Sequence, residues 1–178
     1  MKKRAKKNNR GGFTLVETLV AVLILLLVSM IVAGGLPTAA RALSNAVDAS
    51  HGQVLLSTTM TALRDELSTA KDFSFREEEI SYTDASGATC VIKNDGTNGI
   101  RLEKQAKPKD GSGPDVPESK GPLVSRQAAT SGLYTKFSGA SFSDGIVKIK
   151  DLEVWDGDHM LTGLSGTDFE IEVIGKKG

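Results

Sequence analysis

Residues 10–27 read "RGGFTLVETLVAVLILLL", and this stretch decides how the rest of the chain is arranged. One acid, Glu17, interrupts its apolar run near the start, and residues 18–40 then carry no charge at all. As an α-helix rising 1.5 Å per residue, these 23 residues reach about 35 Å, enough to cross a hydrocarbon core of roughly 30 Å. The stretch therefore predicts a membrane-spanning helix with one carboxylate, Glu17, near its start, which is unusual in an apolar segment.

The formal net charge of zero hides a strong asymmetry along the chain. Residues 1–12 hold six basic side chains and no acid, whereas the remaining 166 residues hold 16 basic and 22 acidic side chains, a net charge of −6. The positive-inside rule then places the N-terminus in the cytoplasm and residues 41–178 outside. Because the part after the leader is acidic, we expect no nucleic-acid partner for the isolated chain.

Two simpler interpretations of the apolar segment stay open. A cleavable secretory signal has an apolar core of about 7–15 residues before a small-residue cleavage site, which Ala40 and Ala42 could mimic, but this run is longer and contains Glu17. A plain single-span anchor explains the length and orientation but not Glu17. A glutamate at the centre of a membrane helix costs on the order of 2.5–3.5 kcal/mol and normally has a partner.

The segment "GGFTLVETLVAVLILLL" resembles the class III signal of type IV prepilins and pseudopilins, with the likeness covering residues 10–36. That pattern is a short basic leader ending in Gly, followed by Phe, Thr, Leu, one apolar residue, Glu and about twenty apolar residues. Its positions here are Gly12, Phe13, Thr14, Leu15, Val16 and Glu17. The resemblance implies that a prepilin peptidase cuts between Gly12 and Phe13 on the cytoplasmic side and N-methylates the new Phe13 amine.

The chemistry of this pattern supports a role in assembly. Gly12 has no side chain, so a protease can hold the backbone around it extended and close. The cut creates an α-amine with a pKa of about 7.7–8, mostly protonated at neutral pH. That amine on an incoming subunit is the natural partner for Glu17 of a subunit already in the assembly, which would neutralise two charges in lipid and set the axial stagger. The alternative is that Glu17 only reaches the lipid headgroups.

One position departs from the pattern. Type IV pilins commonly have a proline 21 residues after the first mature residue, where this chain has Gly34, followed by Gly35 and Pro37. Each glycine weakens a helix by roughly 1 kcal/mol, so the helix could melt or kink at residues 34–37.

Beyond Pro37 the apolar spacing is again helical and predicts one long helix over residues 13–71, with Gly52 as a weak point. The second half should lay an apolar stripe on a sheet, although a coiled-coil face is an alternative. The stripe consists of Leu43, Val47, Val54, Leu56, Met60, Leu63 and Leu67.

From Phe73 onward, alternating segments and turn residues predict antiparallel strands, among them residues 79–84, 89–93, 100–104, 145–155 and 168–174. Residues 105–122 contain four of the five prolines and predict a flexible loop. The expected fold is α+β, a long N-terminal helix packed on a small antiparallel β-sheet head. The expected parts are a leader (1–12), a transmembrane half of the helix (13–40), an amphipathic half (41–72) and the head (73–178).

Candidate catalytic and metal sites are few. The chain has two histidines without zinc-ligand spacing, no phosphate-binding loop and no nucleophile elbow, so we expect neither an enzyme nor a cofactor. Asp156 and Asp158 in "WDGDHM", with the turn "NDGTNG" at residues 94–99, are weak calcium candidates that do not match the EF-hand spacing. Cys90 is the only cysteine and cannot form an internal disulfide.

The sequence therefore favours a pilin-like structural subunit of a type IV pilus or of a secretion or competence pseudopilus. The resemblance implies a prepilin peptidase, other pilin subunits, an assembly-platform membrane protein and membrane lipid as partners. The presence of Glu17 argues against the tip subunit of secretion pseudopili, and the long loop and single cysteine favour a minor subunit. The alternative is a binding or adhesion domain outside the cytoplasm, held by one span and not polymerising.

Overall fold

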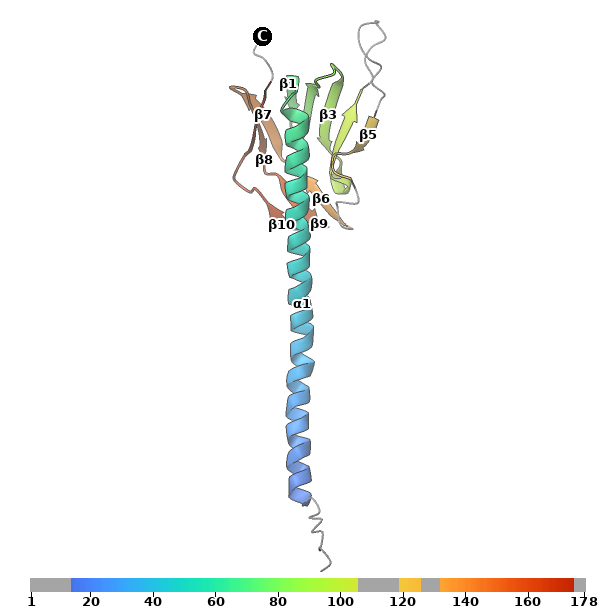
Figure 1. Cartoon of the computed structure of the whole chain (residues 1–178), viewed down its shortest axis with the longest axis vertical. Helices are drawn as coiled ribbons and strands as arrows, with labels where there is room; N and C mark the ends of the chain where they lie inside the picture. The colour runs from blue at the N-terminus through green and yellow to red at the C-terminus, as the bar shows by residue number, and fades with distance from the viewer. Residues whose placement is uncertain (1–13, 106–118, 126–131, 175–178) are drawn as a thin grey trace, which may run out of the picture. The chain divides into compact units, whose positions relative to one another are not determined.

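The computed structural model describes residues 14–105, 119–125 and 132–174 of the 178-residue chain. The fold of these residues is α+β, with one long α-helix, α1 (Leu15–Leu67), followed by eleven strands in antiparallel sheets (Figure 1). This confirms the expected fold class. The chain divides into two compact units, Met1–Asn45 and Ala46–Gly178, and each is described by itself.

In the first unit, α1 runs without a break through Gly34, Gly35 and Pro37. A proline inside a helix has no N–H to donate to the carbonyl one turn earlier. The hydroxyl of the next residue, Thr38, turns back and donates to the Gly34 carbonyl oxygen at 3.2 Å. The helix continues through residues 34–37 and so does not melt there, an outcome that the sequence pattern left open.

In the second unit, one face of α1 is buried against the strands. The predicted stripe was right for Leu56, Leu63 and Leu67, whereas Val47 and Val54 are 42% and 57% exposed. The buried helix residues are Gly52, Leu55, Leu56, Thr59, Leu63 and Leu67. Thr59 fits an apolar face because its hydroxyl donates to the Leu55 carbonyl oxygen of its own helix at 2.8 Å. The stripe is therefore set partly by residues that carry no hydrophobic signal.

The helix ends at Leu67, four residues earlier than the predicted end at residue 71. Ser68 and Thr69 follow, and such side chains compete with helical hydrogen bonding. Lys71 already belongs to strand β1 (Lys71–Arg76). The Ser68 carbonyl oxygen instead accepts a hydrogen bond from the Ile174 N–H at 2.7 Å, which joins the helix end to the C-terminal end of the described chain.

Five strands form the largest sheet, in the order β1-β2-β3-β4-β5. Three of them confirm predicted strands, namely β2 (Glu79–Thr83), β3 (Thr89–Asn94) and β4 (Ile100–Lys104). Between β3 and β4 lies the short 3-10 helix η1 (Gly96–Asn98). Pairing of Tyr82 with Cys90, and of Cys90 with Lys104, aligns these three side chains in one row on the sheet.

The predicted loop over residues 105–122 is wrong at its C-terminal end. There β5 (Ser119–Pro122) pairs with β4, and Lys120 lies opposite Glu103. Pro122 is tolerated because β5 is an edge strand, so one side of its backbone needs no partner in the sheet. Residues 106–118 of the same segment lie outside the described residues.

The other strands form two three-stranded sheets, ordered β10-β9-β6 and β11-β8-β7. Their bounds are β6 (Leu133–Lys136), β7 (Gly139–Ser143), β8 (Ile146–Lys150), β9 (Glu153–Asp156), β10 (His159–Gly163) and β11 (Phe169–Glu172). The alternating run at residues 145–155 thus supplies strands to both sheets. It is divided at Asp151, whose φ is 47° and whose carboxylate accepts hydrogen bonds from Ser138 Oγ and Gly166 N–H.

The core of the second unit lies between the buried face of α1 and the inner faces of the sheets. In β11, Phe169 and Ile171 are 5% and 1% exposed while Glu170 and Glu172 face solvent, as the alternating pattern predicted. The other large side chains with almost no exposure are Tyr82, Phe137, Leu63, Leu67, Ile80, Ile92, Ile149, Leu152, Val147 and Val154. The head is therefore held by ordinary apolar packing.

Candidate functional site

Thr14 is the N-cap of α1. Its carbonyl oxygen accepts hydrogen bonds from the N–H groups of Glu17 and Thr18 at 3.0 and 3.1 Å. Its hydroxyl oxygen also lies 3.3 Å from the Glu17 nitrogen and accepts from that N–H. The first four N–H groups of a helix lack partners within the helix, and a threonine cap satisfies part of this deficit. The pattern Thr-x-x-Glu is the signal that could have revealed this role, and our sequence analysis did not use it.

Glu17 is the third residue of α1, one turn from its start. An acid there interacts favourably with the positive end of the helix dipole. Among the residues that the structure describes, no cation and no hydrogen-bond donor contacts its carboxylate. Within the described residues, the side chain is thus unpaired at a defined place on the helix.

The helix surface around Glu17 is apolar on every side. The large apolar side chains from Leu15 to Leu36 are all between 46% and 81% exposed. A helix that is hydrophobic all round belongs in lipid or among other helices. In the described part of the chain, α1 is the one helix long and apolar enough to cross a membrane, a test that signal sequences also pass. Within the first unit, the described residues therefore combine one carboxylate with an exposed apolar helix surface.

The other predicted site residues are Gly12, Phe13, Asp156 and Asp158. Gly12 and Phe13 lie outside the described residues, so the structure does not test the cleavage site. Asp156 and Asp158 flank Gly157 in the exposed turn between β9 and β10. In the described ranges, no group of three or more His, Cys, Asp or Glu side chains is placed to hold a metal ion.

The second turn proposed for calcium uses its side chains within the fold. Asn94 donates to the Phe137 carbonyl oxygen at 2.7 Å and accepts from the Phe137 N–H at 3.3 Å. Asp95 accepts from Arg101 Nη1 at 2.7 Å. Arg101 holds the pKa of Asp95 below its ordinary value, and Asp95 raises that of Arg101. These oxygens tie β3 and η1 to neighbouring strands.

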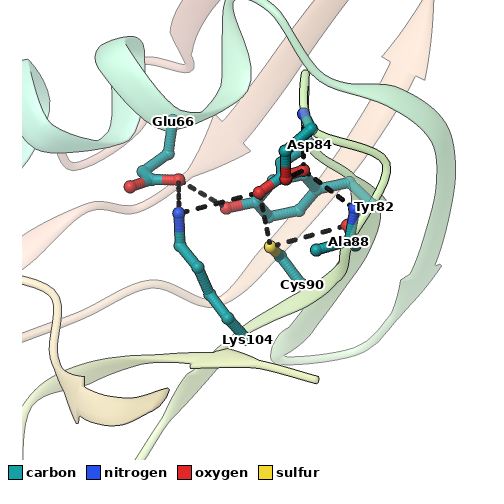
Figure 2. A network of polar contacts seen from close by, with 7 residues as sticks. Glu66, Tyr82, Asp84, Ala88, Cys90 and Lys104 are labelled. Carbon is teal, nitrogen blue, oxygen red and sulfur yellow. Dashed lines mark hydrogen bonds and ion pairs between the residues drawn. The ribbon is translucent and has the colours of Figure 1, made fainter. Parts of the chain in front are cut away.

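A cluster of ionisable side chains lies in the head beneath the last turns of α1 (Figure 2). Glu66 reaches down from the helix, and its Oε2 accepts from the Tyr82 hydroxyl at 3.1 Å. Lys104 lies between two carboxylates, with its Nζ 3.4 Å from Glu66 Oε2 and 3.8 Å from Asp84 Oδ2. The Cys90 thiol donates to Asp84 Oδ2 at 3.8 Å.

The protonation states of this cluster suit a structural role. Burial, assisted by the Glu66 charge, raises the pKa of Tyr82 far above its ordinary value, and burial and the Asp84 charge raise the pKa of Cys90. Both groups therefore stay protonated, whereas the thiolate is the reactive form of a cysteine. The cluster joins α1 to β2, β3 and β4, so we interpret it as a set of structural contacts that hold the helix against the sheet.

A row of partly exposed side chains crosses the sheet formed by β6, β9 and β10. Tyr134 pairs with Trp155, and Trp155 pairs with Met160, so the three lie side by side on the same face. Trp155 is held in place because its Nε1 donates to Glu153 Oε2 at 2.8 Å and Lys136 Nζ lies 3.7 Å from the ring centroid. The row is a half-exposed surface whose polar atoms are already paired within the fold.

Comparison with known proteins bears on the N-terminal segment. Residues 7–33 match the prokaryotic N-terminal methylation motif. Searches of the curated proteins and of the solved structures gave no significant match. The matched residues include Gly12, Phe13, Thr14 and Glu17 and the first half of the apolar surface.

The match identifies a prepilin signal like that of type IV pilins and pseudopilins. It supports a pilin-like subunit that is processed by a prepilin peptidase and assembles with other pilins. The class of proteins that carries this motif is structural, and the apolar helix is consistent with a single-pass membrane anchor. The match therefore bears on the N-terminal helix, the part of the chain that carries Glu17.

Proposed function

We propose that this chain is a filament subunit whose N-terminal helix drives its assembly into a type IV pilus or a secretion or competence pseudopilus. In this proposal, the peptidase cuts between Gly12 and Phe13 and methylates the Phe13 amine, which keeps its positive charge. The subunit waits in the membrane with its N-terminus in the cytoplasm and its head outside. An assembly-platform membrane protein then passes it into the filament.

One observation carries this proposal: the Glu17 carboxylate has no partner among the described residues and lies on a helix whose large apolar side chains are exposed. An isolated carboxylate is costly in lipid and normally has a partner. The protonated amine of a neighbouring subunit, created by the cut, supplies the opposite charge. Since that amine begins four residues before Glu17, the pair would set the axial stagger between neighbouring subunits.

The head contributes contacts rather than chemistry in this proposal. Its ionisable cluster joins α1 to the large sheet, and its outer faces carry paired charges such as Lys148 with Glu170 at 2.7 Å. We place the chain among minor subunits, on the strength of the Pro-rich segment at residues 105–122 and the single cysteine. A membrane-anchored binding domain is the competing function, and the half-exposed row of Tyr134, Trp155 and Met160 is the observation that favours it.

The test compares Glu17→Gln with the wild type in cells that build the filament. Gln keeps the size of the side chain but cannot form the ion pair, so we expect a variant that is cut normally and falls at least about tenfold in the sheared filament fraction, as the loss of about 1.4 kcal/mol would give. Intact mass reports the cut, and immunoblotting reports incorporation. Glu172→Gln, on the exposed face of β11, is the matched control for expression. Normal incorporation of Glu17→Gln would refute the Glu17–amine pair as the basis of assembly, and absence of the wild-type chain from the sheared fraction would refute the filament function.

A further inference from the structure

The amide of Glu17 is shared between two oxygens of Thr14. The Glu17 nitrogen lies 3.0 Å from the Thr14 carbonyl oxygen and 3.3 Å from Thr14 Oγ1. The Thr14 hydroxyl therefore accepts a hydrogen bond from the backbone N–H of Glu17. Glu17 is the residue whose carboxylate we place in the assembly contact. No such bond to Glu17 is made by any other side chain in the described ranges.

The cap matters because of what precedes it. After a cut between Gly12 and Phe13, a single residue would stand before Thr14, so the charged amine and the first helical turn are almost contiguous. Without a cap, the first N–H groups of a helix have no partner and the turn frays. A frayed turn would let both the amine and the Glu17 carboxylate move, and the spacing between them would no longer be defined.

We propose that Thr14 is a positioning residue for assembly, which as the N-cap of α1 holds Glu17 at a fixed distance from the mature amino terminus. This inference rests on the proposed function above and adds a second residue to it. The competing role for Thr14 is recognition by the peptidase, since it would be the second residue after the cut. The two roles differ in the step that fails when Thr14 is changed.

Thr18 provides a matched control one turn later. Its hydroxyl donates to the Leu15 carbonyl oxygen at 2.9 Å and accepts from no helix N–H, so it does not cap the helix. Thr14→Val and Thr18→Val remove the same hydroxyl from the same residue type in the same apolar surroundings. An effect seen only at position 14 would therefore report the cap.

The experiment uses the full chain with Thr14→Val, Thr14→Ser, Thr14→Asn and Thr18→Val, and three measurements. Intact mass reports the cut, the sheared fraction reports incorporation, and amide hydrogen exchange at Glu17 of the mature chain in detergent micelles reports fraying. We expect Thr14→Val to be cut normally, to exchange about 2- to 30-fold faster and to lose incorporation. Ser and Asn are strong N-caps, so both should restore exchange and incorporation, and Thr18→Val should match the wild type.

Three results would overturn the inference. If Thr14→Val stays uncut, Thr14 acts at the peptidase. If Thr14→Ser assembles but Thr14→Asn does not, although both slow the exchange at Glu17, the hydroxyl itself is required and the cap is not the reason. If Thr14→Val assembles normally while Glu17→Gln fails, the proposed function stands and Thr14 has no positioning role. Normal assembly of Glu17→Gln would instead remove the Glu17 ion pair on which this inference rests, and absence of the wild-type chain from the sheared fraction would refute the proposed function itself.

Discussion

At the scale of single residues, Asp84 shows how the head uses a partly buried carboxylate. Its Oδ1 accepts from Ser86 N–H, Ser86 Oγ and Ala88 N–H at 2.9, 2.6 and 2.9 Å. Burial alone would raise its pKa, but these hydrogen bonds and the Lys104 charge outweigh burial and lower the pKa below its ordinary value. The ionised form therefore stabilises the fold, and this contribution is lost as the pH falls through the lowered pKa.

We therefore expect Asp84→Asn to lower the free energy of unfolding by about 1 kcal/mol at pH 7, because Asn can still accept hydrogen bonds but has no charge. The difference from the wild type should be complete above the ordinary pKa of about 3.9 and should shrink below it. Denaturant unfolding of the full chain in micelles, followed by Trp155 fluorescence, measures this. Asp144→Asn, in the exposed β7–β8 turn, is the control. A difference that is equal at pH 7 and pH 3 would contradict the assignment.

The residues of the assembly site could be predicted from the sequence to different degrees. Glu17 was identified because a charge in an apolar run is conspicuous and because its surroundings resemble a known signal. Thr14 belongs to that signal, but the signal alone did not reveal its capping role, since its contribution is a hydrogen bond to a backbone N–H. Asn94 and Asp95 were only weak calcium candidates, and their partners within the fold, Phe137 and Arg101, could not be identified from the sequence.

At the scale of elements, the packing of α1 depends on a glycine. Gly52 is buried, and a Cβ atom there would lie 3.3 Å from Thr162 Cγ2 and 3.4 Å from Leu161 Cβ. The helix can therefore approach β10 this closely only because Gly52 has no side chain. From the sequence it was read as a weak point of the helix, whereas in the structure it is a close contact.

We expect Gly52→Leu to destabilise the head by about 1–3 kcal/mol, because the added atoms must displace β10 or the helix. Gly35→Leu makes the same change in the same helix at a position with no atom within 4 Å of the added Cβ, so it should leave the unfolding of the head unchanged. Thermal unfolding of both variants in micelles gives the comparison. Equal melting temperatures for Gly52→Leu and the wild type would show that the structure accommodates the added side chain without losing stability.

The helix and most strands were predictable because their periodicity is local. The predicted buried stripe failed at Val47 and Val54 because helical spacing alone does not say which of two apolar faces the sheet covers. The buried face contains Gly52 and Thr59, which give no hydrophobic signal. Strand β5 was missed for a related reason, since four residues next to prolines acquire a strand conformation only through pairing with β4.

At the scale of the whole molecule, charge and processing are linked. The six basic residues before Gly12 give the chain its zero net charge, and the part after them carries −6. The positive-inside rule predicts that the leader orients the chain in the membrane, and the leader is then expected to be removed, leaving an acidic head outside. The positive charge that remains near the helix start is the Phe13 amine, the group that we assign to Glu17 of a neighbour.

This link gives a prediction that separates a filament subunit from a plain anchored domain. In cells without the prepilin peptidase, we expect the intact mass of the membrane-bound chain to increase by the mass of residues 1–12 and to lack the methyl group, because no other step removes the leader. The head should remain accessible to protease from outside, since the basic residues still hold the N-terminus in the cytoplasm. Immunoblotting of sheared and membrane fractions should then find the chain only in the membrane. A chain of the same mass in cells with and without the peptidase would identify an uncleaved anchor and would exclude the Phe13 amine as the partner of Glu17.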